Sequence, residues 1–151
     1  MCRRWVKKNG SQTEQSLGRS RGGFSTKIHI LVDALGNSLR FLLTGGQRHD
    51  ITQAEELIDS LLFDAVIADK GYDSDAFLQT IAEREAKAII PARKSRVDSR
   101  DYDAHLYKER HLVECFINKI KWFRRIFTRY DKLARRYTAF LHLAATLIWL
   151  R

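Results

Sequence analysis

A strand, a helix and a second strand are predicted in residues 64–91, "DAVIADKGYDSDAFLQTIAEREAKAIIP". The first apolar run, "AVIA", is short and ends at a turn, which is typical of a buried strand. Ser74 or Asp75 then opens a helix, and "AKAIIP" predicts a second strand that stops at Pro91, the only proline in the chain. A strand, a helix and a strand in this order predict a βαβ unit with parallel strands and a right-handed crossover.

A β-hairpin is predicted upstream of this unit. Residues 24–33 alternate between two faces, with Phe24 and Ile28 on one of them, as a strand does. "ALGN" and the apolar run "SLRFLLT" follow, which indicates a second strand and a turn that contains Gly36 and Asn37.

Two polar segments flank the hairpin. Residues 1–23 are basic and without a clear period, so we expect an irregular segment in which "GRSRGG" is a linker or, alternatively, a phosphate-contacting loop. After the hairpin, Asp50 and Gln53 resemble a capping box that opens a helix through about Leu62. We therefore interpret Asp50 as a helix cap rather than as a catalyst.

Two helices are predicted in the C-terminal part, over about 104–127 and about 132–150. At about 100° per residue, the first helix presents one apolar stripe to the core. The stripe comprises Val113, Phe116, Ile117, Ile120, Phe123 and Phe127. Trp149, near the end of the second helix, is also expected in the core.

A narrow polar face runs beside this stripe and carries Tyr107, Arg110, Glu114 and Lys121, with Arg125 one turn further. A solvated helix face is the ordinary explanation of such a pattern. In that case Arg110 and Glu114 form a surface ion pair worth about 0.3–0.5 kcal/mol.

Asp69 favours a second explanation of the polar face. Alone it would be a turn aspartate, but it ends the first strand of the βαβ unit, where open α/β sheets place their sites. A helix that carries Glu114 and packs against this strand would bring a second carboxylate close. Clustered carboxylates repel one another unless divalent cations neutralise them, and two Mg²⁺ ions about 3.5–4 Å apart suit attack on a phosphodiester.

Composition and charge point to a polyanionic partner. The chain has 151 residues, of which 44% are hydrophobic, and this suits one soluble domain with its own core. Its net charge of +9 favours nucleic acid as partner, with an anionic membrane second. Bases outnumber acids in residues 1–40 and 92–136, whereas acids outnumber bases in residues 41–91. Carboxylates would thus lie in a basic groove, as a metal-using nucleic-acid enzyme needs.

The cysteines and the chain ends exclude several classes of protein. Cys2 and Cys115 have neither a metal-binding spacing nor a disulfide framework, which fits a reducing compartment. The apolar stretch "YTAFLHLAATLIWL" is too short for a membrane span, and the N-terminus has no apolar signal region. We therefore expect a cytoplasmic protein with no membrane partner.

The chain resembles the DDE transposases of bacterial insertion sequences from about Leu17 to its C-terminus. Four segments are similar in order and spacing: "GRSRGGFSTKIHILVDALGN", "GGQRHD", "VIADKGYDSD" and "YKERHLVECFINKIK". The last carries the family's signature, in which Tyr, Arg, Glu and Lys are separated by two, three and six residues.

This resemblance implies an α/β fold with a ribonuclease H-like mixed sheet, a DDE catalytic triad and two Mg²⁺ or Mn²⁺ ions. Asp69 matches the second catalytic Asp and Glu114 matches the catalytic Glu, so both are expected to be catalytic residues and metal ligands. Tyr107, Arg110 and Lys121 match signature positions associated with transposon-end DNA.

The physical roles expected at the DNA follow from the side chains. Arg110 would hold a phosphate through its bidentate fork, Lys121 would act as a point charge, and Arg125 would extend the same basic face. Tyr107 would stack on a base or pack beside the scissile strand.

The resemblance breaks at the first catalytic Asp, which the family carries on a first strand upstream of "GRSRGG". Residues 1–17 contain no Asp, and Asp33 belongs to the hairpin. We therefore expect residues 24–151 to be a catalytic domain that lacks its first strand. Such a chain would be a degraded copy or the second frame of an element expressed by frameshifting.

The expected function is metal-dependent cleavage and transfer of DNA strands at insertion-sequence ends. The expected partners are the double-stranded DNA of the transposon ends and the target, together with a second copy of the chain or an upstream-frame product. One alternative is a non-catalytic DNA-binding remnant that needs a partner frame. A different nuclease on the same fold is another, and the signature spacing argues against it.

Overall fold

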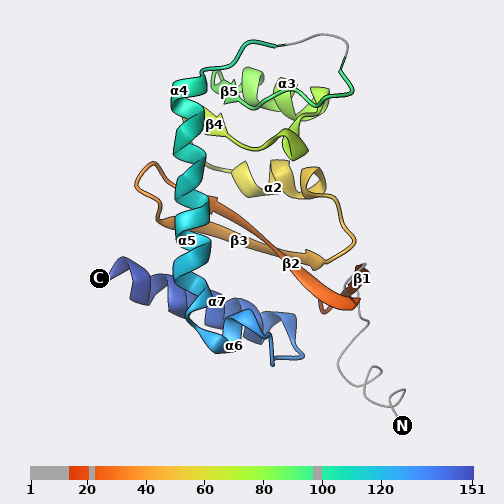
Figure 1. The fold of residues 1–151 in the computed structure, drawn as a ribbon, viewed down its shortest axis with the longest axis vertical. Coiled ribbons are helices and arrows are strands. Elements are labelled where there is room, and N and C mark those ends of the chain that lie inside the picture. Colours follow the sequence, from red (N-terminus) through yellow and green to blue (C-terminus); the bar gives the residue numbers. More distant parts are fainter. Residues whose placement is uncertain (1–13, 21–22, 97–99) are drawn as a thin grey trace.

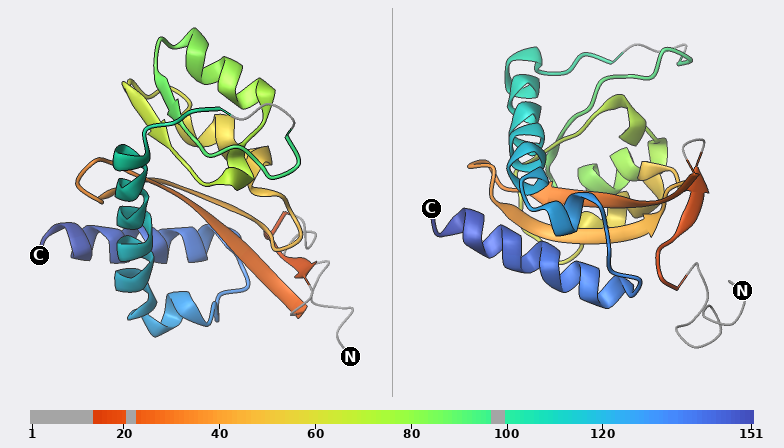
Figure 2. Two further views of the ribbon diagram at one scale, coloured as in Figure 1. Left: turned by 45° about the horizontal axis from the view of Figure 1, so that its top comes forward. Right: turned by 60° about the horizontal axis from the view of Figure 1, so that its bottom comes forward.

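The computed structural model describes residues 14–20, 23–96 and 100–151. Figure 1 shows a β-hairpin at the centre, with a small parallel sheet and its helix on one side and the C-terminal helix on the other. The two views of Figure 2 agree with this arrangement. Helices α4 (Ala104–Tyr107) and α5 (His111–Lys121) run along one side of the molecule, from the parallel sheet past the hairpin to the C-terminal helix (Figure 1).

The hairpin forms where the alternating pattern predicts it. Strand β2 (Gly23–Val32) pairs antiparallel with β3 (Ser38–Gly45). In the turn, the Asp33 carboxylate accepts hydrogen bonds from the backbone N–H of Asn37 at 2.9 Å and from its side-chain amide at 3.1 Å. Gly36 takes a φ of +82°, which a side chain would strain. The hairpin and its turn residues are therefore confirmed.

A third strand extends the hairpin sheet. Strand β1 (Gly18–Ser20) pairs antiparallel with the start of β2, with Gly18 opposite Ser25 and Ser20 opposite Gly23. Part of the segment expected to be irregular is thus a strand, because three residues are too few to show a period in the sequence. The expectation for residues 1–13 lies outside the described residues.

The βαβ unit is confirmed. Strands β4 (Ala65–Ile67) and β5 (Lys87–Ile89) pair in parallel, and helix α3 (Asp75–Glu83) connects them. The Ser74 hydroxyl accepts a hydrogen bond from the backbone N–H of Phe77 at 3.3 Å and caps α3, as a serine before a helix does.

The strands form two separately hydrogen-bonded sheets, β1-β2-β3 and β4-β5. The α/β class is confirmed, but the single mixed sheet expected from the resemblance is not formed by the described residues. Beyond its first three residues, β2 pairs only with β3 in this part of the chain, and β4 pairs only with β5. No described strand bridges the two sheets.

The helix predicted to open at a capping box is short and begins differently. A 3₁₀ turn (Asp50–Gln53) leads into α2 (Ala54–Ile58), well short of Leu62. Asp50 lies inside the first turn and its carboxylate reaches Lys27 of β2, with Oδ1 3.2 Å from Nζ. The capping-box prediction is wrong because the lysine, distant in sequence, attracts this carboxylate away from the backbone.

The long helix predicted over 104–127 is interrupted. It consists of α4 (Ala104–Tyr107), a 3₁₀ turn (Lys108–Arg110), α5 (His111–Lys121) and α6 (Arg124–Phe127). Phe123 takes a ψ of 90° and ends the helical path between α5 and α6. The break resets the helical phase, so Ile126 is buried while Phe127 is 68% exposed. The prediction that Phe127 faces the core is therefore wrong.

The last helix, α7 (Ala134–Trp149), is confirmed, and it buries Tyr137, Leu141 and Ala144 on one face. Trp149 is 55% exposed and does not belong to the core, because it lies off that face at the helix end. No helix in the described part of the chain has the length and apolar character needed to span a membrane.

Two hydrophobic cores lie on opposite sides of the hairpin. The first joins β3, α5, α6 and α7 through Phe41, Phe116, Ile120, Ile126, Tyr137, Leu141, Ala144 and Ala145. The second joins α2 to the βαβ unit through Ala54, Ile58, Val66, Phe77, Ile81 and Ile90. In the first core the rings of Phe41 and Phe116 lie 5.9 Å apart between centroids.

Replacing Phe116 with alanine is expected to destabilise the fold by about 3–5 kcal/mol, because the ring is 1% exposed and its loss leaves a cavity. Phe127→Ala is the matched control on the other side of the helix break, with an expected change within about 0.5 kcal/mol. Urea unfolding of the wild type and the two variants measures their free energies of unfolding. Equal losses in both variants would contradict the position of the break.

Candidate active site

A pocket of about 340 Å³ lies where β2, β4, α2 and α5 meet. Asp69 and Glu114, the two carboxylates predicted from the sequence, both line it. Arg110, Asp50 and Tyr72 contribute to the same wall. The fold thus brings Asp69 and Glu114 to one pocket from elements that are distant in the chain.

Asp69 is fixed by the turn that follows β4. Its Oδ1 accepts a hydrogen bond from the backbone N–H of Gly71 at 2.6 Å, and this bond orients the carboxyl group at the strand end. A Cβ on Gly71 would lie 2.7 Å from the same oxygen, closer than side-chain atoms normally approach. A side chain at residue 71 would therefore push the Asp69 carboxylate away from the position in which the Gly71 amide holds it.

Glu114 lies in the first turn of α5 and is paired with Arg110. The Arg110 Nη2 atom donates to Glu114 Oε1 at 2.6 Å, and the guanidinium lies 5.9 Å from the ring centroid of Tyr107. The hydrogen bond to Glu114 raises the pKa of Arg110, and the charges of Glu114 and Asp69 act in the same direction. Arg110 therefore interacts with both of the carboxylates predicted from the sequence, Asp69 and Glu114.

The two basic residues further along the helix do not line this pocket. Lys121 borders a separate pocket of about 550 Å³ between β2 and the α5–α6 region, and its Nζ lies 3.5 Å from Asn118 Oδ1. Arg125 lies beyond the helix break, where it donates to the Asp131 carboxylate at 3.0 and 3.1 Å. The prediction that Arg125 shares one helix face with Arg110 and Lys121 assumed an unbroken helix, whereas Arg125 lies in α6, after the break. The contact of Arg125 with DNA stays a prediction.

The comparison with protein families decides the identity of the chain. A transposase DDE domain model matches residues 4–149, nearly the whole chain. The chain belongs to the transposase DDE domain family.

Two relatives support this assignment of the DDE domain. One from Brucella ovis is named as a transposase for insertion sequence element IS6501 and is 43% identical over 129 residues, which cover 84% of this chain and 99% of the relative. Another, from Burkholderia cepacia, is named for element IS402 and is 32% identical over 142 residues, covering 86% of this chain and 64% of the relative. No solved structure matches the chain.

The pocket of the DDE domain contains a third acidic side chain, that of Asp50. The sequence pattern had predicted that Asp50 caps a helix. The Asp50 carboxylate lies 3.2 Å from Lys27 Nζ and 3.5 Å from His29 Nδ1. The other ring nitrogen of His29 lies 2.8 Å from the Thr44 hydroxyl, so the imidazole has a polar partner on each side, Asp50 of the 3₁₀ turn and Thr44 of β3. A histidine within an otherwise regular strand was the one sequence signal for this network.

Tyr72 supplies a neutral hydroxyl to the pocket of the DDE domain. Burial raises the pKa of Tyr72, and the nearby charges of Asp50 and Asp69 raise it further. The phenol therefore stays protonated at neutral pH and can donate a hydrogen bond on the pocket wall.

The described residues contain no group of three or more His, Cys, Asp or Glu side chains arranged to hold a metal ion. Asp69 and Glu114 provide carboxylate oxygens, which are the ligands that Mg²⁺ and Mn²⁺ prefer. The chemistry of this pair fits such an ion. Asp50, the third carboxylate of the pocket, is not grouped with them and lies against Lys27 and His29.

Because His29 is buried, the free energy of unfolding is expected to depend on pH. Burial lowers the pKa of His29 below its usual value of 6.5, although Asp50 partly opposes this shift. Below that value the unfolded chain binds a proton that folded His29 does not yet accept, so stability is full above about pH 6.5 and falls as the pH decreases. Urea unfolding between about pH 7.5 and about pH 5.5 measures the loss.

His29→Gln is expected to lose less stability than the wild type over this interval, because the titrating group is gone. His49→Gln, which removes an exposed histidine from the adjacent loop, is the control and should behave as the wild type. An unchanged pH dependence in His29→Gln would contradict the buried neutral imidazole.

Proposed function

We propose that this chain is the catalytic part of an insertion-sequence transposase, which cleaves and transfers DNA strands in a reaction that needs divalent metal ions. The observation that carries the proposal is the shared pocket of Asp69 and Glu114, with Arg110 beside both. Membership of the DDE family and the +9 charge of the chain support a DNA substrate.

In this proposal Asp69 and Glu114 hold the metal ions. When bound, Mg²⁺ or Mn²⁺ would activate the attacking oxygen and stabilise the leaving oxygen of the phosphodiester. Asp69 keeps one carboxylate oxygen on the Gly71 amide, and this fixes the direction of its other oxygen. Two ions are expected, as in other sites that displace groups at phosphorus.

Arg110 has a double role in the proposed reaction. Its pair with Glu114 is exposed and spans one helical turn, and pairs of this kind contribute about 0.3–0.5 kcal/mol. Such a pair exchanges easily, so Arg110 can turn its fork to a phosphate while Glu114 turns to an ion. Tyr107, next to Arg110, is placed to stack on a base, and Lys121 adds a charge to the same side of the helix.

A ribonuclease H-like sheet completed by a further strand forms the second part of the proposal. Residues of β2 and β4 both line the pocket, although these strands belong to different sheets. Strand edges without a partner are templates for another strand. A segment inserted between β2 and β4 would join the sheets and could bring a third carboxylate next to Asp69.

This segment would come from an upstream-frame product or from a second copy of the chain. The observation in its favour is that Ile28, Ile30 and Leu31 of β2 and Val66 and Ile67 of β4 line one pocket. The protein would then act as an assembly on the DNA of transposon ends and target.

Cleavage of a duplex that carries the ends of this element, with Mn²⁺ or Mg²⁺, tests the proposal. Asp69→Asn and Glu114→Gln should each reduce cleavage to background, since either change removes a metal ligand. Glu109→Gln changes an exposed glutamate on the 3₁₀ turn before α5 and should leave cleavage unchanged. Activity that survives both site variants would contradict the assignment of Asp69 and Glu114.

The same assay, run with and without the upstream-frame product, tests whether the domain needs a partner in order to cleave DNA. Cleavage that needs both proteins supports a domain completed by a partner. Binding without cleavage in either case supports the alternative function, a DNA-binding remnant.

Lys121→Ala is expected to weaken DNA binding, because it removes one contact with a phosphate. The slope of log affinity against log salt concentration should fall by about 1. Lys119→Ala is the matched control, because Lys119 lies on the same helix but borders a different pocket. Fluorescence anisotropy at several salt concentrations measures both slopes, and an affinity that ignores salt would contradict DNA binding through phosphates.

A further inference from the structure

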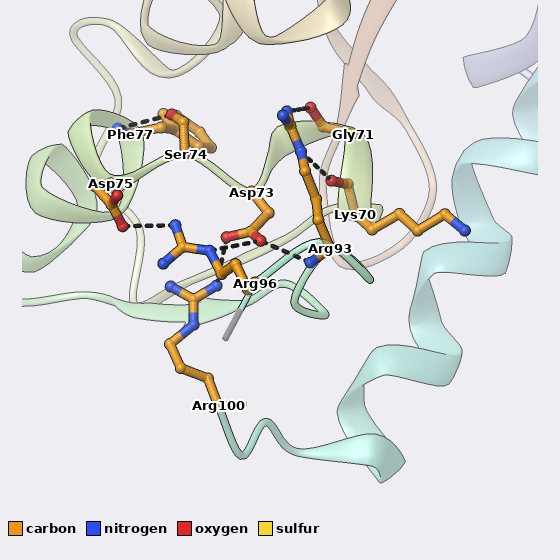
Figure 3. Close-up of polar contacts among 9 residues, drawn as sticks. All are labelled: Lys70, Gly71, Asp73, Ser74, Asp75, Phe77, Arg93, Arg96 and Arg100. Carbon is orange, nitrogen blue, oxygen red and sulfur yellow. Dashed lines mark hydrogen bonds and ion pairs between the residues drawn. The ribbon is translucent and has the colours of Figure 1, made fainter. Parts of the chain in front are cut away.

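A buried carboxylate lies outside the pocket, four residues beyond Asp69 in the chain. The Asp73 side chain is 0% exposed, although the segment around it is polar. Three arginines from the loop after β5 surround it (Figure 3): Arg93, Arg96 and Arg100. We call Asp73 and these three residues the arginine clamp.

Every described bond of the Asp73 carboxylate goes to this loop. Its Oδ2 accepts from the backbone N–H of Arg93 at 2.7 Å and from Arg96 Nε at 2.9 Å, while its Oδ1 accepts from Arg100 Nη2 at 2.7 Å. Burial opposes the charge, but the bonds from Arg93 and Arg96 and the charge of Arg100 outweigh it and lower the pKa of Asp73. The carboxylate is therefore ionised.

The clamp continues to the turn that holds Asp69. The Arg93 guanidinium donates to the backbone carbonyls of Lys70, at 3.1 Å, and Gly71, at 2.8 Å (Figure 3). Gly71 in turn donates its N–H to the Asp69 carboxylate. An unbroken series of hydrogen bonds thus connects Asp73 to Asp69 through Arg93 and Gly71.

Fold stability alone explains this arrangement poorly. Arg93 and Lys94 are exposed, so apolar burial does little to fix this part of the loop. Buried ion pairs add little net stability because desolvation offsets their attraction, so the arrangement is better explained by the geometry that it fixes. The geometry fixed here is that of the turn after β4.

We infer that Asp73 is a positioning residue for the active site, which acts through Arg93 to hold the Lys70–Gly71 turn and thereby the Asp69 carboxylate. The inference rests on the proposed function in one respect, that Asp69 is a metal ligand. It predicts that opening the clamp changes the surroundings of Asp69 without unfolding the domain.

NMR of the metal-free protein tests this through the Gly71 amide, the donor to Asp69. Arg93→Ala removes the link to the turn but keeps the backbone bond to Asp73. In this variant the Gly71 amide proton should shift upfield and exchange with solvent about tenfold faster, as expected for a weakened hydrogen bond. Asp73→Asn should give the same signature at Gly71, with the amides of α7 unchanged in both.

Asp75→Asn is the matched control, because Asp75 pairs with Arg96 on the surface, where the carboxylate is 87% exposed. Its Gly71 amide should match the wild type. If Asp73→Asn does not fold, Arg93→Ala decides the question by itself. A wild-type Gly71 signal and exchange rate in Arg93→Ala would overturn the inference.

Titration with Mn²⁺ separates this inference from the proposed function. Paramagnetic broadening of the Gly71 amide should require several-fold more Mn²⁺ in Arg93→Ala than in the wild type. If the wild type shows no broadening there, the proposed metal site fails, while the metal-free amide comparison still decides whether Asp73 positions the turn.

Discussion

The burial of Phe116 against Phe41 of the hairpin is the interaction on which the site depends. It fixes the rotation of α5, and two residues along an α-helix correspond to about 200°. Burying Phe116 therefore turns Glu114 away from that core and toward the pocket beside β4.

The two proposed metal ligands, Asp69 and Glu114, are held by different means. Asp69 depends on local backbone, since its carboxylate accepts a bond from the Gly71 amide and a side chain at residue 71 would displace it. Glu114 depends on long-range packing, since its helix is anchored in the first hydrophobic core through Phe116 and Ile120. The pocket lies between the two cores, so its shape follows from how α5 and α2 hold the hairpin and the βαβ unit together.

Arginines neutralise both buried aspartates in the described part of the chain. Asp73 takes three bonds from the loop after β5, and Asp131 takes two from Arg125, whose guanidinium also lies 3.9 Å from the ring centroid of Phe140. Part of the +9 charge therefore serves to order loops. Lys121, which is exposed on α5, is among the cations that remain available to a polyanion.

The hairpin, the βαβ unit, the last helix and the family could be predicted from the sequence, because periodicity, turn residues and motif spacing are properties of neighbouring residues. The structure was needed to show that Asp50 pairs with Lys27, that the helix breaks before Phe127, and that the strands form two sheets. The contacts of Asp73 with the three arginines could not be predicted from the sequence pattern either. Each of these features depends on a contact between elements distant in the chain, and a local pattern carries no information about which distant partner a charge or an apolar ring will meet.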